Sequence, residues 1–190
     1  MKEKSKWFSL RLTEEEAPWA FVRGKPSRAI STLELLAATV GLVLLAQVSL
    51  AEPGVSGSVT VTGFTDSLVS SSVVTRGLTT AFPLCAVAME LAAQLEVRNA
   101  ELHLEWVPRE QNAEADMLAD GRSTGFKEEN RVQARLGQIR WLVLDRLLAA
   151  GLAFQKESEK YKRKLPVGTG KRAGRLALAG AKRLREREPW

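Results

Sequence analysis

Three carboxylates stand where a strand pattern ends or a helix pattern begins: Glu34, Asp66 and Asp116. Asp66 closes the Val- and Thr-rich run 59–66, and Asp116 lies early in the helix-forming run that follows Pro108. Because the carboxyl ends of parallel strands gather at one edge of an α/β sheet, acids at such ends can converge there. Converging carboxylates bind hard cations such as Mg²⁺, and two such ions about 4 Å apart can assist phosphodiester cleavage.

Each of these acids also has a purely structural interpretation. Glu34 can be a capping acid near the start of its helix, and Asp66 can form the turn that follows its strand. Asp116 can interact favourably with the dipole of its own helix. It is their combination, on elements in this order, that favours a metal site over three separate roles.

The elements expected around these acids alternate between strands and helices. Ser31 or Thr32 is a suitable N-cap for the first long helix, and a break of the last helix at Gly151 stays open. The run 67–77 is compatible with either a short helix or a loop. This alternation predicts an α/β layer with parallel strands in its middle. Period-2 and period-3.6 patterns predict strands at 7–12, 20–23, 59–66 and 101–107 and helices at 33–50, 82–99, 112–119 and 130–162.

Three segments in this order carry a family resemblance: ISTLELLA (30–37), GFTDS (63–67) and LEWVPREQNAEADMLAD (104–120). They resemble the ribonuclease H domain that follows the polymerase in retrotransposon reverse transcriptases. The resemblance covers about residues 7–120, and the third motif is the most specific. It implies a mixed sheet with flanking helices and a two-metal site that cleaves RNA in RNA–DNA hybrids with Mg²⁺ or Mn²⁺.

The resemblance also implies roles for single residues. Glu34, Asp66 and Asp116 match metal-binding, catalytic carboxylates of the family, and Asn112 would help to fix the start of the last helix. The family's first-strand Asp has no counterpart, because no Asp precedes Asp66. The strand at 7–12 corresponds to the family's second or third. We therefore expect a domain with incomplete N-terminal strands that does not cleave hybrids.

Charge is concentrated at the C-terminal end of the chain. Residues 155–190 hold twelve Lys/Arg and four Glu, a balance of +8, so residues 1–154 sum to −2 within the total of +6. A basic tail of this kind favours nucleic-acid binding, although a disordered solubilising tail explains it equally well. The residues expected to bind nucleic acid are Lys171, Arg172, Arg175, Lys182, Arg183 and Arg185.

The composition limits the cross-links and metal sites that the chain can form. One cysteine and one histidine exclude an internal disulfide and a Cys/His zinc cage. No apolar signal core follows Met1, which predicts an intracellular protein, cytoplasmic or nuclear, that is not secreted. The expected organisation is a partial ribonuclease H-like domain at 1–120, a helical extension at 121–163 and a basic, disordered tail at 164–190.

Two alternative functions stay open. One is a non-catalytic nucleic-acid-binding protein that uses the basic tail. The other is a small membrane protein anchored by residues 33–51, since the 17 residues from Leu35 to Ala51 carry no charge. That length is at the lower limit for a bilayer span. Polar residues interrupt the run, and a helix that is apolar on all sides is also what packs inside a protein.

Overall fold

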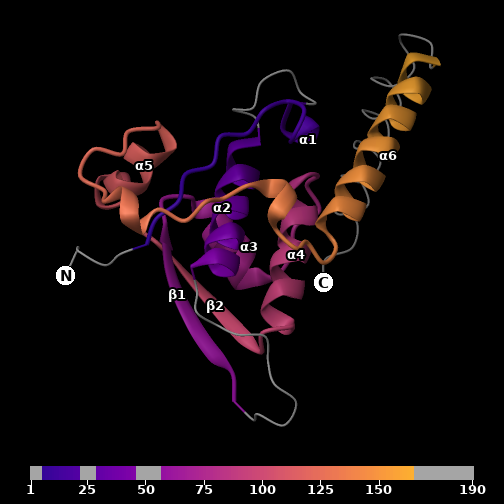
Figure 1. Cartoon of the computed structure of the whole chain (residues 1–190). Helices are drawn as coiled ribbons and strands as arrows, with labels where there is room; N and C mark the ends of the chain where they lie inside the picture. Colours follow the sequence, from indigo (N-terminus) through magenta and orange to yellow (C-terminus); the bar gives the residue numbers. More distant parts are fainter. Residues whose placement is uncertain (1–5, 22–28, 46–56, 165–190) are drawn as a thin grey trace, which may run out of the picture. The chain divides into compact units, whose positions relative to one another are not determined.

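The computed structural model describes residues 6–21, 29–45 and 57–164 of the chain. It shows a mixed α/β protein that divides at Gly151 into two units, residues 1–151 and 152–190. The contacts on which the candidate site depends lie in the first unit. The elements, labelled in Figure 1, are α1 (Pro18–Phe21), α2 (Ile30–Leu44), β1 (Val59–Thr65), α3 (Leu68–Arg76), α4 (Leu84–Glu96), β2 (Ala100–Trp106), α5 (Ala113–Ala119) and α6 (Leu144–Lys164).

The sheet of the described residues has two parallel strands, β1 and β2. Their register runs from Val59 opposite Ala100 to Thr65 opposite Trp106, so both strands end at the same level. The connection between them contains α3 and α4, as expected for parallel strands that need a crossover. Figure 1 shows α2, α3 and α4 beside this pair of strands. The predicted strands 59–66 and 101–107 are thus confirmed to within a residue.

The core lies between these helices. Leu35, Leu36 and Val40 of α2 are buried, as are Val87 and Leu91 of α4. These apolar side chains recur at helical spacing, so their burial places one face of each helix in the core.

The polar residue Thr39 interrupts the apolar run of α2 and finds a hydrogen-bond partner inside the protein. The hydroxyl of buried Thr39 donates to the carbonyl oxygen of Leu35 at 2.8 Å. In the described part of the chain no helix is both long and apolar enough to cross a membrane. Residues 46–51 of the predicted span lie outside the described residues.

The open choice at 67–77 is settled as a helix, α3. The hydroxyl oxygen of Ser67, the N-cap, accepts a hydrogen bond from the backbone N–H of Ser70 at 3.2 Å. Gly77 ends the helix with φ +66°, a left-handed conformation that costs glycine little. The N-cap Ser67 directly follows Asp66, so the cap fixes the turn in which that acid lies.

Two N-terminal strand predictions are wrong. Residues 20 and 21 of the predicted strand at 20–23 belong to helix α1, in which Trp19 and Ala20 are buried, and residues 22 and 23 lie outside the described residues. The predicted strand at 7–12 reduces to a single bridge between Trp7 and Arg131. The Trp7 indole is buried and packs in a tilted arrangement against the Phe126 ring. The Arg131 guanidinium lies over the indole, 5.1 Å from the centre of the ring. Trp7 therefore packs against Phe126 and Arg131 and is not part of a strand of the β1–β2 sheet.

Two helix predictions also need correction. Helix α2 starts at Ile30 with Ala29 as N-cap and no side-chain cap, so neither Ser31 nor Thr32 caps it and Glu34 lies beyond the first turn. The helix predicted at 130–162 begins only at Leu144. It is not broken at Gly151, which lies inside α6, and the Phe82 ring occupies the space that a Cβ would need there. A glycine at this position permits close helix packing rather than a break.

Candidate functional site

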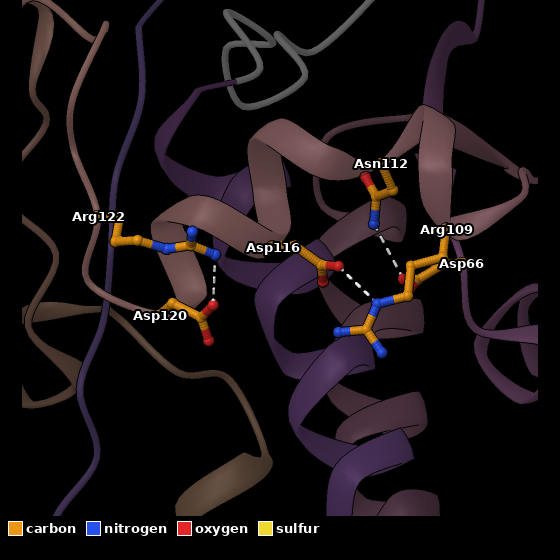
Figure 2. A network of polar contacts seen from close by, with 6 residues as sticks. All are labelled: Asp66, Arg109, Asn112, Asp116, Asp120 and Arg122. Atoms are coloured by element: carbon orange, nitrogen blue, oxygen red, sulfur yellow. Dashed lines mark hydrogen bonds and ion pairs between the residues drawn. The ribbon is translucent and has the colours of Figure 1, made fainter.

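Asp66 occupies the turn between β1 and α3. Its backbone oxygen accepts a hydrogen bond from the indole Nε1 of Trp106, the last residue of β2, at 3.0 Å. Its carboxylate oxygen Oδ1 accepts a hydrogen bond from Nδ2 of Asn112 at 2.9 Å (Figure 2). Asn112 is the residue directly before α5. One aspartate therefore joins the end of β1, the end of β2 and the start of α5.

Asp116 lies in the first turn of α5, as the sequence predicts. Its Oδ2 accepts a hydrogen bond from Nε of Arg109 at 2.6 Å, an ion pair in which the arginine side chain is 75% exposed and the aspartate 31% (Figure 2). Arg109 opens a short 3-10 turn between β2 and α5. The pKa of Arg109 is raised, first by the hydrogen bond that it donates to Asp116, then by the charge of Asp116, and further by the charges of Asp66 and Asp120.

Glu34 is half-buried in α2. The start of that helix lies next to α3, since Ser70 donates from its hydroxyl to the Ser31 carbonyl oxygen at 3.4 Å. Nevertheless, nowhere in residues 6–21, 29–45 and 57–164 do three or more His, Cys, Asp or Glu side chains form a group that could hold a metal ion. The structure therefore links Asp66 and Asp116 in one polar network and does not add Glu34 to a metal-binding group.

The side chains of this network, as they lie, do not fit a two-metal centre. Hard cations need free carboxylate oxygens as ligands. Here Oδ2 of Asp116 faces a guanidinium and Oδ1 of Asp66 faces an amide. The Mg²⁺ or Mn²⁺ site expected from the resemblance stays a prediction.

The remaining residues considered from the sequence are not part of this network. The six basic residues expected to bind nucleic acid, between Lys171 and Arg185, lie outside the described residues. His103, the single histidine of the sequence, is exposed on β2. It carries no part of the network at the strand ends.

Sequence reasoning missed Glu90, an acid of α4 that is completely buried. Its carboxylate accepts hydrogen bonds from three consecutive backbone N–H groups, those of Leu142 at 3.0 Å, Val143 at 2.7 Å and Leu144 at 2.8 Å. These groups lie at the start of α6, where backbone donors have no partner inside the helix. Glu90 therefore sets the position at which α6 begins, which explains why the helix does not start near residue 130.

A side-chain network supports Glu90 along the same helix. Gln94 donates from Nε2 to Oε1 of Glu90 at 2.5 Å and to the Arg140 carbonyl oxygen at 3.0 Å. Arg98 in turn donates to the side chain and the backbone oxygen of Gln94. Burial lowers the pKa of Arg98, and the charge of Glu90 acts against that shift. The sequence signal was an acid at position 90 within the apolar face formed by Val87 and Leu91.

Comparisons with known proteins assign no family to this arrangement. No protein-family model matches the chain, and no curated protein and no solved structure matches it either. The function has to be inferred from the chain's own residues.

Proposed function

We propose that the chain is a ribonuclease H-like domain of retroelement reverse-transcriptase origin that binds nucleic acid and does not cleave it. The proposal combines the three sequence motifs with the polar network at the strand ends. The mixed α/β architecture is compatible with it, although two strands are too few to identify a ribonuclease H-like sheet.

The observation that carries the proposal is the hydrogen bond between Asn112 and Asp66. These residues come from two motifs that are 46 positions apart, and the parallel register of β1 and β2 brings their ends together. The resemblance assigns Asp66 to the strand-end acid and Asn112 to the start of the last helix. Their contact supports treating both motifs as parts of one site.

The absence of cleavage follows from charge. Two dications about 4 Å apart repel each other and need several carboxylates to hold them. The sequence offers no Asp before Asp66 to match the family's first-strand ligand, and Asp116 is paired with Arg109. What remains is too little negative charge for the cleaving arrangement.

The nucleic-acid affinity is assigned to the basic tail. Residues 155–190 carry a balance of +8, against −2 for the rest of the chain. Lysine and arginine side chains that neutralise phosphates release counterions, so the binding constant falls steeply as salt increases. An acidic remainder would contribute little to such binding.

The test is a salt titration of the full chain against a fluorescein-labelled RNA–DNA hybrid, followed by anisotropy. In one variant Lys171, Arg172, Lys182 and Arg183 are changed to Gln. In a matched control the same number of exposed arginines outside the tail are changed to Gln, namely Arg11, Arg76, Arg135 and Arg140. The slope of log K against log salt is negative, and for the tail variant it should become shallower by about 3.6 units, since each lost phosphate contact accounts for about 0.9.

Two results would contradict the proposal. One is an absence of measurable hybrid binding by the unaltered chain at low salt. The other is an equal loss of slope in the tail variant and in the control.

A further inference from the structure

Arg109 forms an ion pair with Asp116 near the start of α5. Its Nε is 2.6 Å from Oδ2 of Asp116, and Figure 2 shows its side chain reaching across from the turn that also bears Asn112. Asp66 and Asp120 are near enough for their charges to act on it as well. No other residue shown in this network places a positive charge between Asp66 and Asp116 (Figure 2).

A guanidinium is a permanent cation, because it does not lose its proton in proteins. It therefore provides the positive charge that a pair of neighbouring carboxylates needs. It also contacts one of the two Asp116 oxygens that a hard divalent ion could use as ligands, and its charge repels that ion. An arginine and a divalent cation consequently compete for Asp116.

We propose that Arg109 is an internal counter-cation for Asp116, and that it keeps divalent cations from binding Asp116 together with the neighbouring Asp66. Metal binding then requires the arginine side chain to move away or to be replaced. Because Arg109 is mostly exposed, its displacement breaks no packing, so the block is electrostatic and local. The inference depends on the geometry of the described residues and holds whether or not the chain binds hybrids.

The test is a titration of the full chain with Mn²⁺, in which free Mn²⁺ is measured by electron paramagnetic resonance. Replacing the guanidinium by a neutral amide in Arg109→Gln should tighten Mn²⁺ binding by about tenfold, since it removes one positive charge next to the ligands. Arg109→Lys keeps the charge and should bind Mn²⁺ as weakly as the unaltered chain. The double variant Arg109→Gln with Asp66→Asn should lose the gain.

The chain offers a matched control in Arg122. This arginine is 63% exposed and pairs with Asp120 at 2.7 Å, in an ion pair like that of Arg109. Arg122→Gln removes the same net charge but leaves Arg109 in place, so Mn²⁺ affinity should change less than about twofold.

Three results would overturn the proposal: no gain in Arg109→Gln, an equal gain in Arg122→Gln, or an equal gain in Arg109→Lys. Circular dichroism of each variant before titration checks that it is folded. Because the assay contains no nucleic acid, a negative result here is distinct from a failure of hybrid binding.

Discussion

The protein uses carboxylates in two contrasting regions. In the α4–α6 contact, which comprises Phe82, Glu90 and Gln94 with residues 140–144 and Gly151, the acid is completely buried and accepts backbone hydrogen bonds at 2.7–3.1 Å. At the strand-end site, which comprises Asp66, Arg109, Asn112 and Asp116, the acids are half-buried and contact side chains. The first acid is enclosed by the fold, and the others remain accessible.

This difference separates a structural role from a candidate functional role. A buried carboxylate is tolerated only when hydrogen bonds replace its hydration, so its partners are fixed by folding. An exposed ion pair contributes little to stability, because water screens it. Substitutions in the α4–α6 contact should therefore change the stability of the protein, whereas substitutions at the strand-end site should change what it binds.

The largest effect is expected at Glu90. Glu90→Ala leaves the N–H groups of Leu142, Val143 and Leu144 without their acceptor and opens a cavity, so the free energy of unfolding should fall by about 3–5 kcal/mol. Urea unfolding followed by circular dichroism measures it. The control Glu96→Ala removes an exposed acid from the same helix and should cost less than about 0.5 kcal/mol. Equal losses of stability in both variants would show that the buried hydrogen bonds of Glu90 stabilise the fold no more than an exposed acid does.

A smaller effect is expected at Gly151. A Val side chain there would overlap with the Phe82 ring, and the resulting overpacking should lower the free energy of unfolding by about 1–3 kcal/mol. Gly137→Val is the matched control, because nothing lies within 4 Å of a Cβ at that position. If both glycines tolerate Val equally in the same urea experiment, the close contact between Phe82 and Gly151 is not part of the folded state.

The smallest effect on stability is expected at the strand-end site. Asn112→Ala removes one partly exposed hydrogen bond to Asp66, and the free energy of unfolding should fall by no more than about 1 kcal/mol. The double variant Asp66→Asn with Asp116→Asn should also stay within about 1 kcal/mol of the unaltered chain. A loss as large as that of Glu90→Ala would show that these acids support the fold.

The parts predictable from the sequence are those whose signal is local. The alternation of Val and Thr in 59–66 identifies β1, and the run after Pro108 identifies α5, so the positions of Asp66 and Asp116 on their elements follow directly. The hydrogen-bond and ion-pair partners of Asp66 and Asp116 are harder to predict from the sequence. Nothing in the spacing of Arg109 and Asp116, seven positions apart, identifies an ion pair, because it depends on the 3-10 turn between them.

The missed elements depend on contacts between distant residues. Residues 130–143 have a helical pattern but form no long helix, because Glu90, more than 50 positions away, fixes the start of α6. Residues 7–12 alternate like a strand, yet Trp7 packs against Phe126 and Arg131, more than 100 positions away. No window of the sequence contains both partners, so local patterns favour the wrong element.

The proposed function requires that the strand-end site, which we propose to be of ribonuclease H-like origin, does not cleave nucleic acid. The most direct measurement is incubation of the full chain with a 5′-labelled RNA–DNA hybrid in Mg²⁺ or Mn²⁺, with products separated on a denaturing gel. We expect no cleavage by the unaltered chain. Robust cleavage that is lost in Asp66→Asn would contradict it, and would show that another residue supplies the missing ligand, with the Glu14–Glu16 cluster the first to examine.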